Sequence, residues 1–202
     1  MKILIACEES QEVCKAFRRL GYEAFSCDTE PCSGGHPEWH IQDDVLKHLK
    51  DGWDMMIAHP PCTFLCRNRA KLNKEQQKKE EIEEGYKFFK QLQNANIPLI
   101  CVENPVPSRL SPLYQTYNQI IQPYHFGHDF SKKTCLWLKG LSKLKSTKIV
   151  PLTYITTKNG FKYTSGWYKC PRNSKARSKT FPGIAKAMAE QWGTLFKPKE
   201  MK

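Results

Sequence analysis

The sequence predicts an α/β protein with a mostly parallel sheet and helices on both faces. Short apolar runs alternate along the chain with stretches of helical periodicity. The opening run Lys2–Ala6 is continuously apolar after its first residue, which is typical of a parallel strand buried on both faces. A polar loop with reactive side chains follows the end of each main apolar run, and ligands of parallel sheets bind at that edge.

The first elements form the start of a βαβ unit. Lys2–Ala6 is the first predicted strand, and Ser10 is expected to N-cap the following helix. Gly21 suits the end of that helix, and residues 23–27 form the second strand. The helix has apolar residues at i, i+4 spacing, namely Val13, Cys14, Phe17 and Leu20.

The remaining elements continue the alternation up to a basic C-terminal third. Pro182 is expected to open the last helix, and residues 140–178 read as irregular and basic. The other helices are predicted at 45–49 and 74–93, the latter with a buried stripe of Ile82, Tyr86, Phe89 and Leu92. The other strands are predicted at 53–58, 97–102, 120–126 and 134–138.

The charge is distributed unevenly over the 202 residues. Residues 1–139 contain 18 Lys/Arg and 18 Asp/Glu, whereas residues 140–202 contain 14 Lys/Arg and 2 Asp/Glu. We therefore expect one catalytic domain formed by 1–139 and 179–202, with 140–178 as a small basic insertion. Aromatic residues lie among the cations of this insertion, which favours nucleic-acid contact over a solvated Lys-rich tail: Phe161, Tyr163, Trp167 and Tyr168.

The composition predicts a cytoplasmic protein with no membrane partner. No apolar run approaches the roughly 20 residues that a bilayer span needs, and the N-terminal apolar stretch stops at Glu8. The nine cysteines are expected to be reduced thiols. Four residues have spacings compatible with zinc, but an ordinary loop is the favoured interpretation and no metal is expected: Cys27, Cys32, His36 and His40.

Two strand ends carry the reactive groups of greatest interest. Cys62 follows Pro60-Pro61, a stiff turn that can hold a thiol in one place. A thiol near positive charge or a helix N-terminus has a lowered pKa and becomes a nucleophile. Glu103 ends a later strand and can hydrogen-bond the Watson–Crick edge of a flipped base. Taken singly, a buried thiol and a surface acid are the more ordinary interpretations.

Together these residues resemble the cytosine-C5 DNA methyltransferases. His59-Pro60-Pro61-Cys62-Thr63 looks like the Pro-Pro-Cys catalytic loop of that family, and Val102-Glu103-Asn104-Pro105 looks like its Glu-Asn-Val motif. The resemblance implies a Rossmann-like methyltransferase fold and S-adenosylmethionine (AdoMet) as methyl donor. It also implies a Cys62 thiolate that adds to C6 of cytosine while Glu103 holds the base. The substrate would be DNA, either a duplex with a flipped cytosine or a single strand.

The resemblance assigns further residues. Asp28 would contact the AdoMet ribose, Asp44 the adenine amino group, and Lys133 would belong to a basic strand at the catalytic pocket. The expected cofactor contacts are Cys7, Glu9, Ser10, Asp28, Asp44 and Pro60. The expected nucleic-acid contacts are Arg67, Arg69, Lys132, Lys169, Arg172 and Arg177. The segment 180–192 would return to the cofactor side.

Three departures from the family's pattern keep other interpretations open. The first loop, Ala6 to Gln11, lacks the family's glycines, so Ser10 and free N–H groups of the helix start would have to compensate. Thr63 and Pro105 replace the usual glutamine and valine. The recognition segment is short, which predicts weak sequence specificity. A degenerate binding protein with this fold, or the same chemistry on RNA or a free nucleotide, are the alternatives. Compact members of the family resemble phage or prophage products, which mask a genome from restriction.

Overall fold

The computed structural model describes residues 1–63, 65–66, 75–109, 111–171 and 173–196. One sheet organises this part of the chain, in the order β3-β2-β1-β4-β5-β7-β6. β7 runs antiparallel to both β5 and β6, and the other strand pairs are parallel. The strands are β1 Lys2–Ala6, β2 Glu23–Asp28, β3 His40–Gln42, β4 Met55–Ala58, β5 Leu99–Pro105, β6 Gln119–Ile121 and β7 Thr134–Lys139. This order confirms the predicted Rossmann-like methyltransferase fold class.

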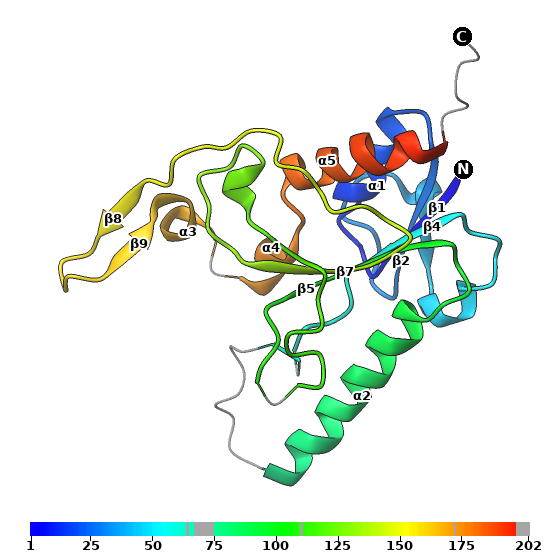
Figure 1. Ribbon diagram of the computed structural model, residues 1–202, viewed down its shortest axis with the longest axis horizontal. Helices are drawn as coiled ribbons and strands as arrows, with labels where there is room; N and C mark the ends of the chain where they lie inside the picture. Colours follow the sequence, from blue (N-terminus) through cyan, green and yellow to red (C-terminus); the bar gives the residue numbers. More distant parts are fainter. Residues whose placement is uncertain (64, 67–74, 110, 172, 197–202) are drawn as a thin grey trace.

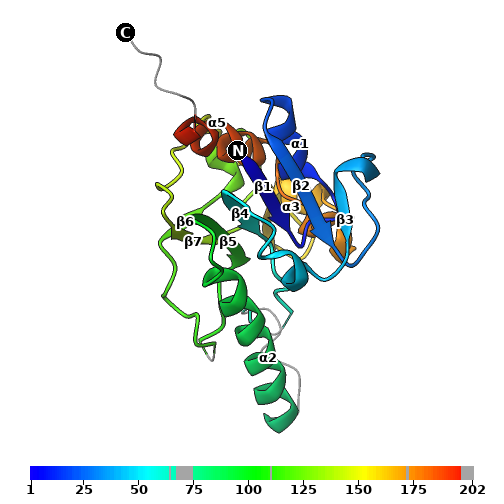
Figure 2. The ribbon, with the colours of Figure 1, turned by 90° about the vertical axis from the view of Figure 1, so that its right-hand side faces the viewer.

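Helices cover both faces of the sheet (Figures 1 and 2). α1 and α5 pack together on one face, and α2 lies on the other. The helices are α1 Glu12–Arg19, α2 Glu75–Gln93, α3 Ser165–Lys169, α4 Ser174–Ser178 and α5 Pro182–Gly193. Short 3-10 turns are η1 Pro37–Trp39, η2 Val45–His48, η4 Pro123–His125 and η5 Thr194–Phe196.

The protein has one hydrophobic core on each face of the sheet, and side chains of β1 point alternately into the two. Ile3 and Ile5 are buried against α1 and α5, in a cluster that includes Phe17 and Trp192. Leu4 and Ala6 point to the opposite face and join a second cluster. That cluster includes Phe89 and Leu92 of the stripe predicted for α2. The side chains on both faces of β1 are therefore buried from solvent, as expected for a central parallel strand.

The start of α1 differs from the expectation, because Ser10 does not cap it. Gln11 occupies the N-cap position with a left-handed backbone (φ 58°) and makes no side-chain capping bond. Instead, the buried Glu8 carboxylate accepts the backbone N–H groups of Val13 at 2.7 Å and Cys14 at 3.2 Å. An acid before the helix, rather than the hydroxyl at its expected boundary, satisfies the exposed N–H groups.

The segment 140–178 is more ordered than the expectation of irregular structure. β8 (Tyr154–Thr156) and β9 (Lys162–Thr164) form a separate antiparallel hairpin, and α3 and α4 follow it. In Figure 1 this hairpin projects from the body as an arm. The strand expected at 120–126 ends at Ile121, and Pro123, which has no N–H for a ladder, begins η4.

Candidate active site

The parallel pairing of β4 and β5 brings the two predicted motifs together. Ala58 is in register with Val102, so His59 and Glu103 are the next residues on adjacent strands. The His59 N–H donates to the carbonyl of Ala6 at 2.9 Å, which continues the pairing of β4 with β1 by one residue. The Cys62 loop and the Glu103 motif therefore leave the sheet at one edge, as parallel topology predicts.

A buried amide fastens the two motifs to each other. The side-chain Nδ2 of Asn104 donates to the carbonyl oxygen of Pro60 at 2.9 Å. Asn104 is 2% exposed, so this bond is protected from water. The carbonyl of Pro60, a predicted cofactor residue, is thus engaged by the neighbouring strand, which sets the direction in which the loop continues to Cys62.

His59 and Glu103 form a largely buried ion pair at this edge. Nδ1 of His59 lies 2.8 Å from Oε2 of Glu103, and the two side chains are 11% and 17% exposed. Burial alone would lower the pKa of His59, but the hydrogen bond and charge of Glu103 outweigh burial and raise it. Burial alone would raise the pKa of Glu103, but the His59 hydrogen bond and charge lower it. Glu103 is therefore held as a carboxylate.

Cys62 shares the electrostatic environment of this pair. Its carbonyl accepts the N–H groups of Leu65 at 3.2 Å and Cys66 at 3.1 Å, so a helical turn follows the thiol. A side-chain hydrogen bond with Cys66, burial and the Glu103 charge raise the pKa of Cys62, and among the described residues the charge of Lys132 opposes them. The expectation of a lowered thiol pKa is wrong for this state. The Cys66 side chain is the largest influence on the pKa of Cys62.

Within the part of the chain that the structure describes, Lys132 is the cation whose charge acts on this site. Its charge acts on His59, Cys62 and Glu103, and its Nζ donates to the carbonyl of Arg177 at 3.0 Å. Lys133, the residue predicted at the catalytic pocket, acts on Cys135, on which the charge of Glu103 also acts. A small hollow at this position joins the sheet edge to the start of α5, with a lining of Glu103, Lys132, Thr134, Ser178, Lys179, Thr180, Phe181, Ile184 and Met188.

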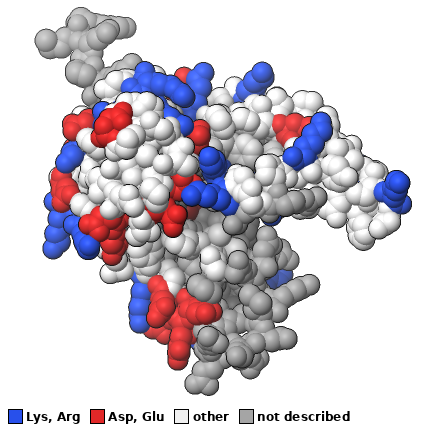
Figure 3. Space-filling view, turned by 180° about the vertical axis from the view of Figure 1, so that it is seen from behind, with Lys and Arg blue, Asp and Glu red and all other residues white. Residues whose placement is uncertain are grey.

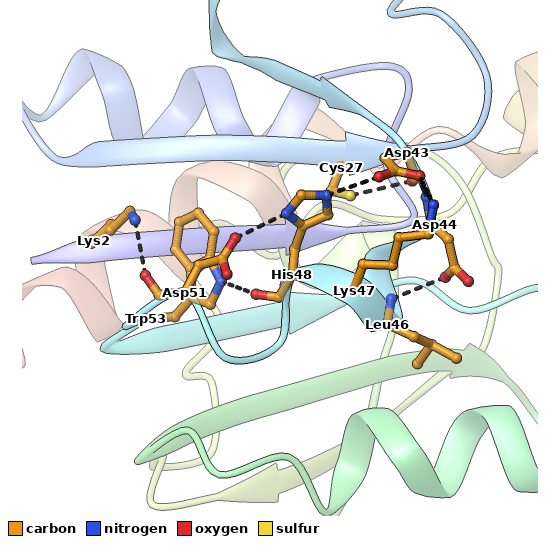
Figure 4. Close-up of polar contacts among 9 residues, drawn as sticks. All are labelled: Lys2, Cys27, Asp43, Asp44, Leu46, Lys47, His48, Asp51 and Trp53. Atoms are coloured by element: carbon orange, nitrogen blue, oxygen red, sulfur yellow. Dashed lines mark hydrogen bonds and ion pairs between the residues drawn. The ribbon is translucent and has the colours of Figure 1, made fainter.

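At the ends of β1, β2 and β3, two of the predicted cofactor residues act on a third. Burial, followed by the charges of Asp28 and Asp44, raises the pKa of Cys7. One oxygen of Asp28 accepts the N–H of Glu30 at 3.0 Å. Oδ1 of Asp44 accepts the N–H of Leu46 at 3.0 Å and so caps η2 (Figure 4). These two bonds engage one carboxylate oxygen of each aspartate.

Asp43, next to Asp44, has both carboxylate oxygens engaged by side chains of the same turn. Its Oδ1 binds Nζ of Lys47 at 2.7 Å, and its Oδ2 lies 3.3 Å from Nε2 of His48 (Figure 4). The Lys47 hydrogen bond is the main reason that the pKa of Asp43 falls to about 2. The other ring nitrogen of His48 lies 2.9 Å from Asp51. This network stiffens the turn that presents Asp44, whose charge acts on Cys7 together with that of Asp28.

The glycine-poor first loop is built around two acids with different surroundings. Cys7 has a positive φ of 59°, a conformation usually left to glycine. Glu8 turns inward to cap α1, so the N–H groups of Val13 and Cys14 are not free to bind a cofactor, contrary to the expectation. Oε2 of Glu9 is buried and has no hydrogen-bond partner within the described residues. Ser10, also buried, lies beneath Gly34, whose missing Cβ would meet the Ser10 carbonyl at 2.7 Å.

The basic segment returns to the site through α4. Arg177, in the last turn of α4, accepts Lys132 through its carbonyl, and Lys175 lies 3.9 Å from Glu30 in the loop after β2. Lys169 ends α3 and is exposed. In Figure 3 the arm extends to the right with Lys or Arg at its tip, whereas basic and acidic side chains are mixed over the body. Three predicted nucleic-acid contacts lie outside the described residues: Arg67, Arg69 and Arg172.

The four residues with zinc-compatible spacing do not form a ligand group within the described part of the chain. His40 uses Nδ1 toward the Ser26 hydroxyl at 2.8 Å and Nε2 toward the Glu30 carbonyl at 2.9 Å. His36 lies 3.0 Å from Glu38 and stacks on Trp39. Across the same residues, no helix combines the length and apolar character needed to cross a bilayer.

Comparison with known proteins gives a structural likeness only. No protein-family profile matches the chain, and no curated protein sequence matches it. Among solved structures, 45 chains match. One is an E. coli protein named as a candidate DNA modification methyltransferase encoded within a prophage, with a TM-score of 0.49 and 13% identity. The match covers 76% of this chain and 53% of that one, so this chain spans about half the length of that solved chain.

Proposed function

We propose that this protein is a DNA cytosine-C5 methyltransferase with Cys62 as nucleophile and Glu103 as the residue that holds the base. The observation that carries the proposal is the joint presentation of these two side chains at the ends of adjacent parallel strands. The Asn104–Pro60 bond fastens their loops together, and the charge of Glu103 acts on the Cys62 thiol. An acid and a thiol in one partly buried site suit attack on a ring that is held by its polar edge.

The roles of the residues follow from the chemistry of cytosine. The Cys62 thiolate would add to C6, which moves electron density toward C5 and N3. Glu103 would bind the N3 and N4 edge of the base. The electron density that moves to N3 must be neutralised there by a proton. Lys132 opposes the negative charge of Glu103 and favours the thiolate of Cys62. The raised pKa of Cys62 requires that substrate binding separate the thiol from Cys66 or bring additional positive charge.

The predicted cofactor edge carries carboxylate acceptors that suit the N–H and O–H groups of AdoMet. Asp28 and Asp44 each use one carboxylate oxygen in the bonds described above, and the other oxygens suit ribose hydroxyls and an adenine amino group. The buried Oε2 of Glu9 lacks a partner within the described chain, and it suits the α-ammonium of a methionine moiety. When bound, AdoMet supplies the electrophilic methyl group. Cys7, Ser10 and Pro60 would contribute to the walls of this site.

DNA is the proposed partner because of the charge of the insertion. Residues 140–178 contain Lys and Arg but neither Asp nor Glu. Lys169 and Arg177 would contact phosphates, as would Arg67, Arg69 and Arg172 outside the described residues. Exposed rings on the arm add stacking surfaces, since Phe161 is 62% exposed and Tyr154 is 51% exposed. A base must leave the stack before Cys62 can reach its C6, so a flipped or unpaired cytosine is required.

A second candidate function is favoured by one specific observation. Glu8 occupies the start of α1, where a helix N-terminus would otherwise attract an anionic ligand group. A protein with the fold and the basic arm, but without cofactor binding, would still bind nucleic acid. This degenerate binding protein predicts DNA affinity without any AdoMet affinity.

One experiment separates these functions. Wild type, Cys62→Ser and Glu103→Gln are incubated with labelled AdoMet and with duplex DNA, single-stranded DNA, RNA or free cytidine nucleotide. We expect 5-methylcytosine in DNA with wild type, none with Cys62→Ser, and a loss of at least about 100-fold with Glu103→Gln. Lys87→Ala, an exposed change on α2, is the matched control. Label in RNA or nucleotide alone would move the substrate, and DNA binding with no AdoMet binding by calorimetry would favour the degenerate protein.

A further inference from the structure

His59 is a titratable group at the centre of the site that the proposed roles do not use. One ring nitrogen, Nδ1, lies 2.8 Å from Oε2 of Glu103. The other, Nε2, is buried and has no hydrogen-bond partner within the described residues. The backbone N–H of His59 is tied to Ala6, so the ring is carried by the central strands rather than by a mobile loop. Such a group is placed to exchange a proton with Glu103 and with little else.

Among the described residues, charges from three parts of the chain act on His59. Glu103 on β5 is in direct contact, Glu8 faces the ring from the loop between β1 and α1, and Lys132 faces it from the segment before β7. Two carboxylates against one ammonium favour the imidazolium. The unpartnered Nε2 has the opposite effect, because a buried N–H without an acceptor is costly. The imidazolium therefore depends on the negative charge of Glu103 in particular.

We propose that His59 is a positioning residue that holds Glu103 in place and stores the proton that N3 of cytosine takes up when Cys62 adds to C6. This inference rests on the proposed function. His59 acts through Glu103 and is not expected to touch the base. The proposal assigns a function to His59, which precedes Pro60-Pro61 and to which the family resemblance assigns no role.

The proton and electron pairs balance in this step. The thiolate pair of Cys62 forms the S–C6 bond, the C5=C6 π pair moves to C4–C5, and the C4=N3 π pair becomes a lone pair on N3. The Nδ1–H bond of His59 breaks as a proton passes to the Glu103 carboxyl group. Rotation of that group carries the proton to N3. The sulfur loses its negative charge and the imidazole its positive charge, so the net charge of the site is unchanged.

Substrate entry supplies the reason for the transfer. A base that covers the site removes water from the His59–Glu103 pair, and a lower local dielectric favours imidazole plus carboxylic acid over two separated charges. The proton returns by the same route when Cys62 leaves. Glu103 then begins and ends each turnover as a carboxylate, consistent with its lowered pKa in the free protein.

The test uses His59→Asn, because the Asn amide can replace Nδ1 as a hydrogen-bond donor to Glu103 but cannot store a proton. We expect 5-methylcytosine formation to fall by about 100-fold or more with His59→Asn, within the range for a lost proton transfer. The wild-type kcat profile should rise with pH as Cys62 ionises and fall as His59 loses its proton. The falling limb should disappear in His59→Asn. His125→Asn, in η4 and outside the site, is the matched control.

The failures are distinguishable. If wild type makes no 5-methylcytosine in any substrate, the proposed function fails and the role of His59 fails with it. If wild type is active while His59→Asn keeps both its rate and the falling limb, only the role of His59 is overturned. NMR of labelled histidine adds a readout independent of turnover. The pKa of His59 should drop in Glu103→Gln, and an unchanged His59 titration would contradict the stored proton.

Discussion

Asn104 on β5 holds the carbonyl of Pro60 on the neighbouring loop at 2.9 Å, so the strand that presents Glu103 also fixes the path of the chain to Cys62. Thiol and carboxylate are positioned by one buried contact between their motifs rather than by each loop separately. This contact explains why an Asn follows Glu103, a position at which a solvated loop residue would have no such requirement.

Replacement of Asn104 should therefore reduce methylation activity strongly, although Asn104 has no proposed contact with the reacting atoms. Asn104→Ala removes a buried donor and leaves the Pro60 carbonyl unsatisfied, so we expect a loss of about 1–3 kcal/mol in the free energy of unfolding. Methylation should fall further than the lost stability explains. Urea denaturation and methylation rates at a temperature where the variant is folded check this. Asn118→Ala, whose side chain accepts the Leu138 N–H on the same sheet, is the control for stability alone. Equal losses of activity in both variants would contradict the positioning role.

The contact between Cys62 and Cys66 should restrain the nucleophile. The Cys66 side chain is the largest cause of the raised pKa of Cys62, so Cys66→Ala should lower that pKa and increase the thiolate fraction at pH 8. The measurement is the rate of iodoacetamide labelling of Cys62 against pH, followed by mass spectrometry. Cys170→Ala, at the end of α3, is the control. Labelling of Cys62 that is unchanged or slower in Cys66→Ala would contradict the assignment.

The order of elements was predictable because it follows from local pattern. Continuous apolar runs gave the central strands, and the i, i+4 stripe gave α2, since Phe89 and Leu92 are fully buried. The convergence of the Cys62 and Glu103 loops followed from one topological rule, that parallel strands end at the same edge. None of these steps required knowledge of side-chain contacts.

The details that the sequence did not predict depend on register and backbone path. Lys132 and Lys133 are adjacent, and only the three-dimensional arrangement decides which one acts on Glu103. Ser10 fits the local pattern of an N-cap, but left-handed backbone at Cys7 and Gln11 redirects the loop so that Glu8 reaches the helix start. The three-residue strands β8 and β9 lie outside both cores and leave too short a pattern to be recognised.

The burial of the Glu8 cap should make the free energy of unfolding depend on pH. Burial raises the pKa of Glu8 to about 6, against 4.5 for the ordinary group. Because the folded pKa is the higher one, the stabilising effect of protonation is fully present below pH 4.5 and is lost as the pH rises through about 6. Glu8→Gln keeps one acceptor and has no charge to bury, so wild type should gain about 1–2 kcal/mol relative to Glu8→Gln between pH 7 and pH 4.5.

Removal of the cap itself is a separate comparison. Glu8→Ala should cost about 0.5–2 kcal/mol at pH 7, as for other lost N-caps. Denaturant titrations of the three proteins across this pH range check both expectations. Glu23→Gln, an exposed change at the start of β2, controls for the loss of a carboxylate outside the cap. A difference between wild type and Glu8→Gln that is independent of pH would contradict the assigned protonation.

The arm formed by β8 and β9 should bind single-stranded DNA through two separable contributions. Lys158 and Lys162 are exposed there, and Nζ of Lys162 lies 4.6 Å from the ring centre of Tyr154. If both lysines contact phosphates, Lys158→Ala/Lys162→Ala should reduce the slope of log K against log salt by about 1.4, from about 0.7 per phosphate contact on a single strand. Lys186→Ala, on α5 and paired with Glu190, should leave the slope unchanged.

The aromatic contribution should have the opposite signature. Phe161, 62% exposed and directly before β9, offers a ring to an unpaired base. Phe161→Ala should weaken single-strand binding by about 1–3 kcal/mol, the value of one stacked base, without changing the salt slope. Fluorescence anisotropy with a labelled oligonucleotide at several salt concentrations measures both quantities. A Phe161→Ala variant with full affinity, or with an altered slope, would mean that the ring does not stack on a base and that the arm binds by charge.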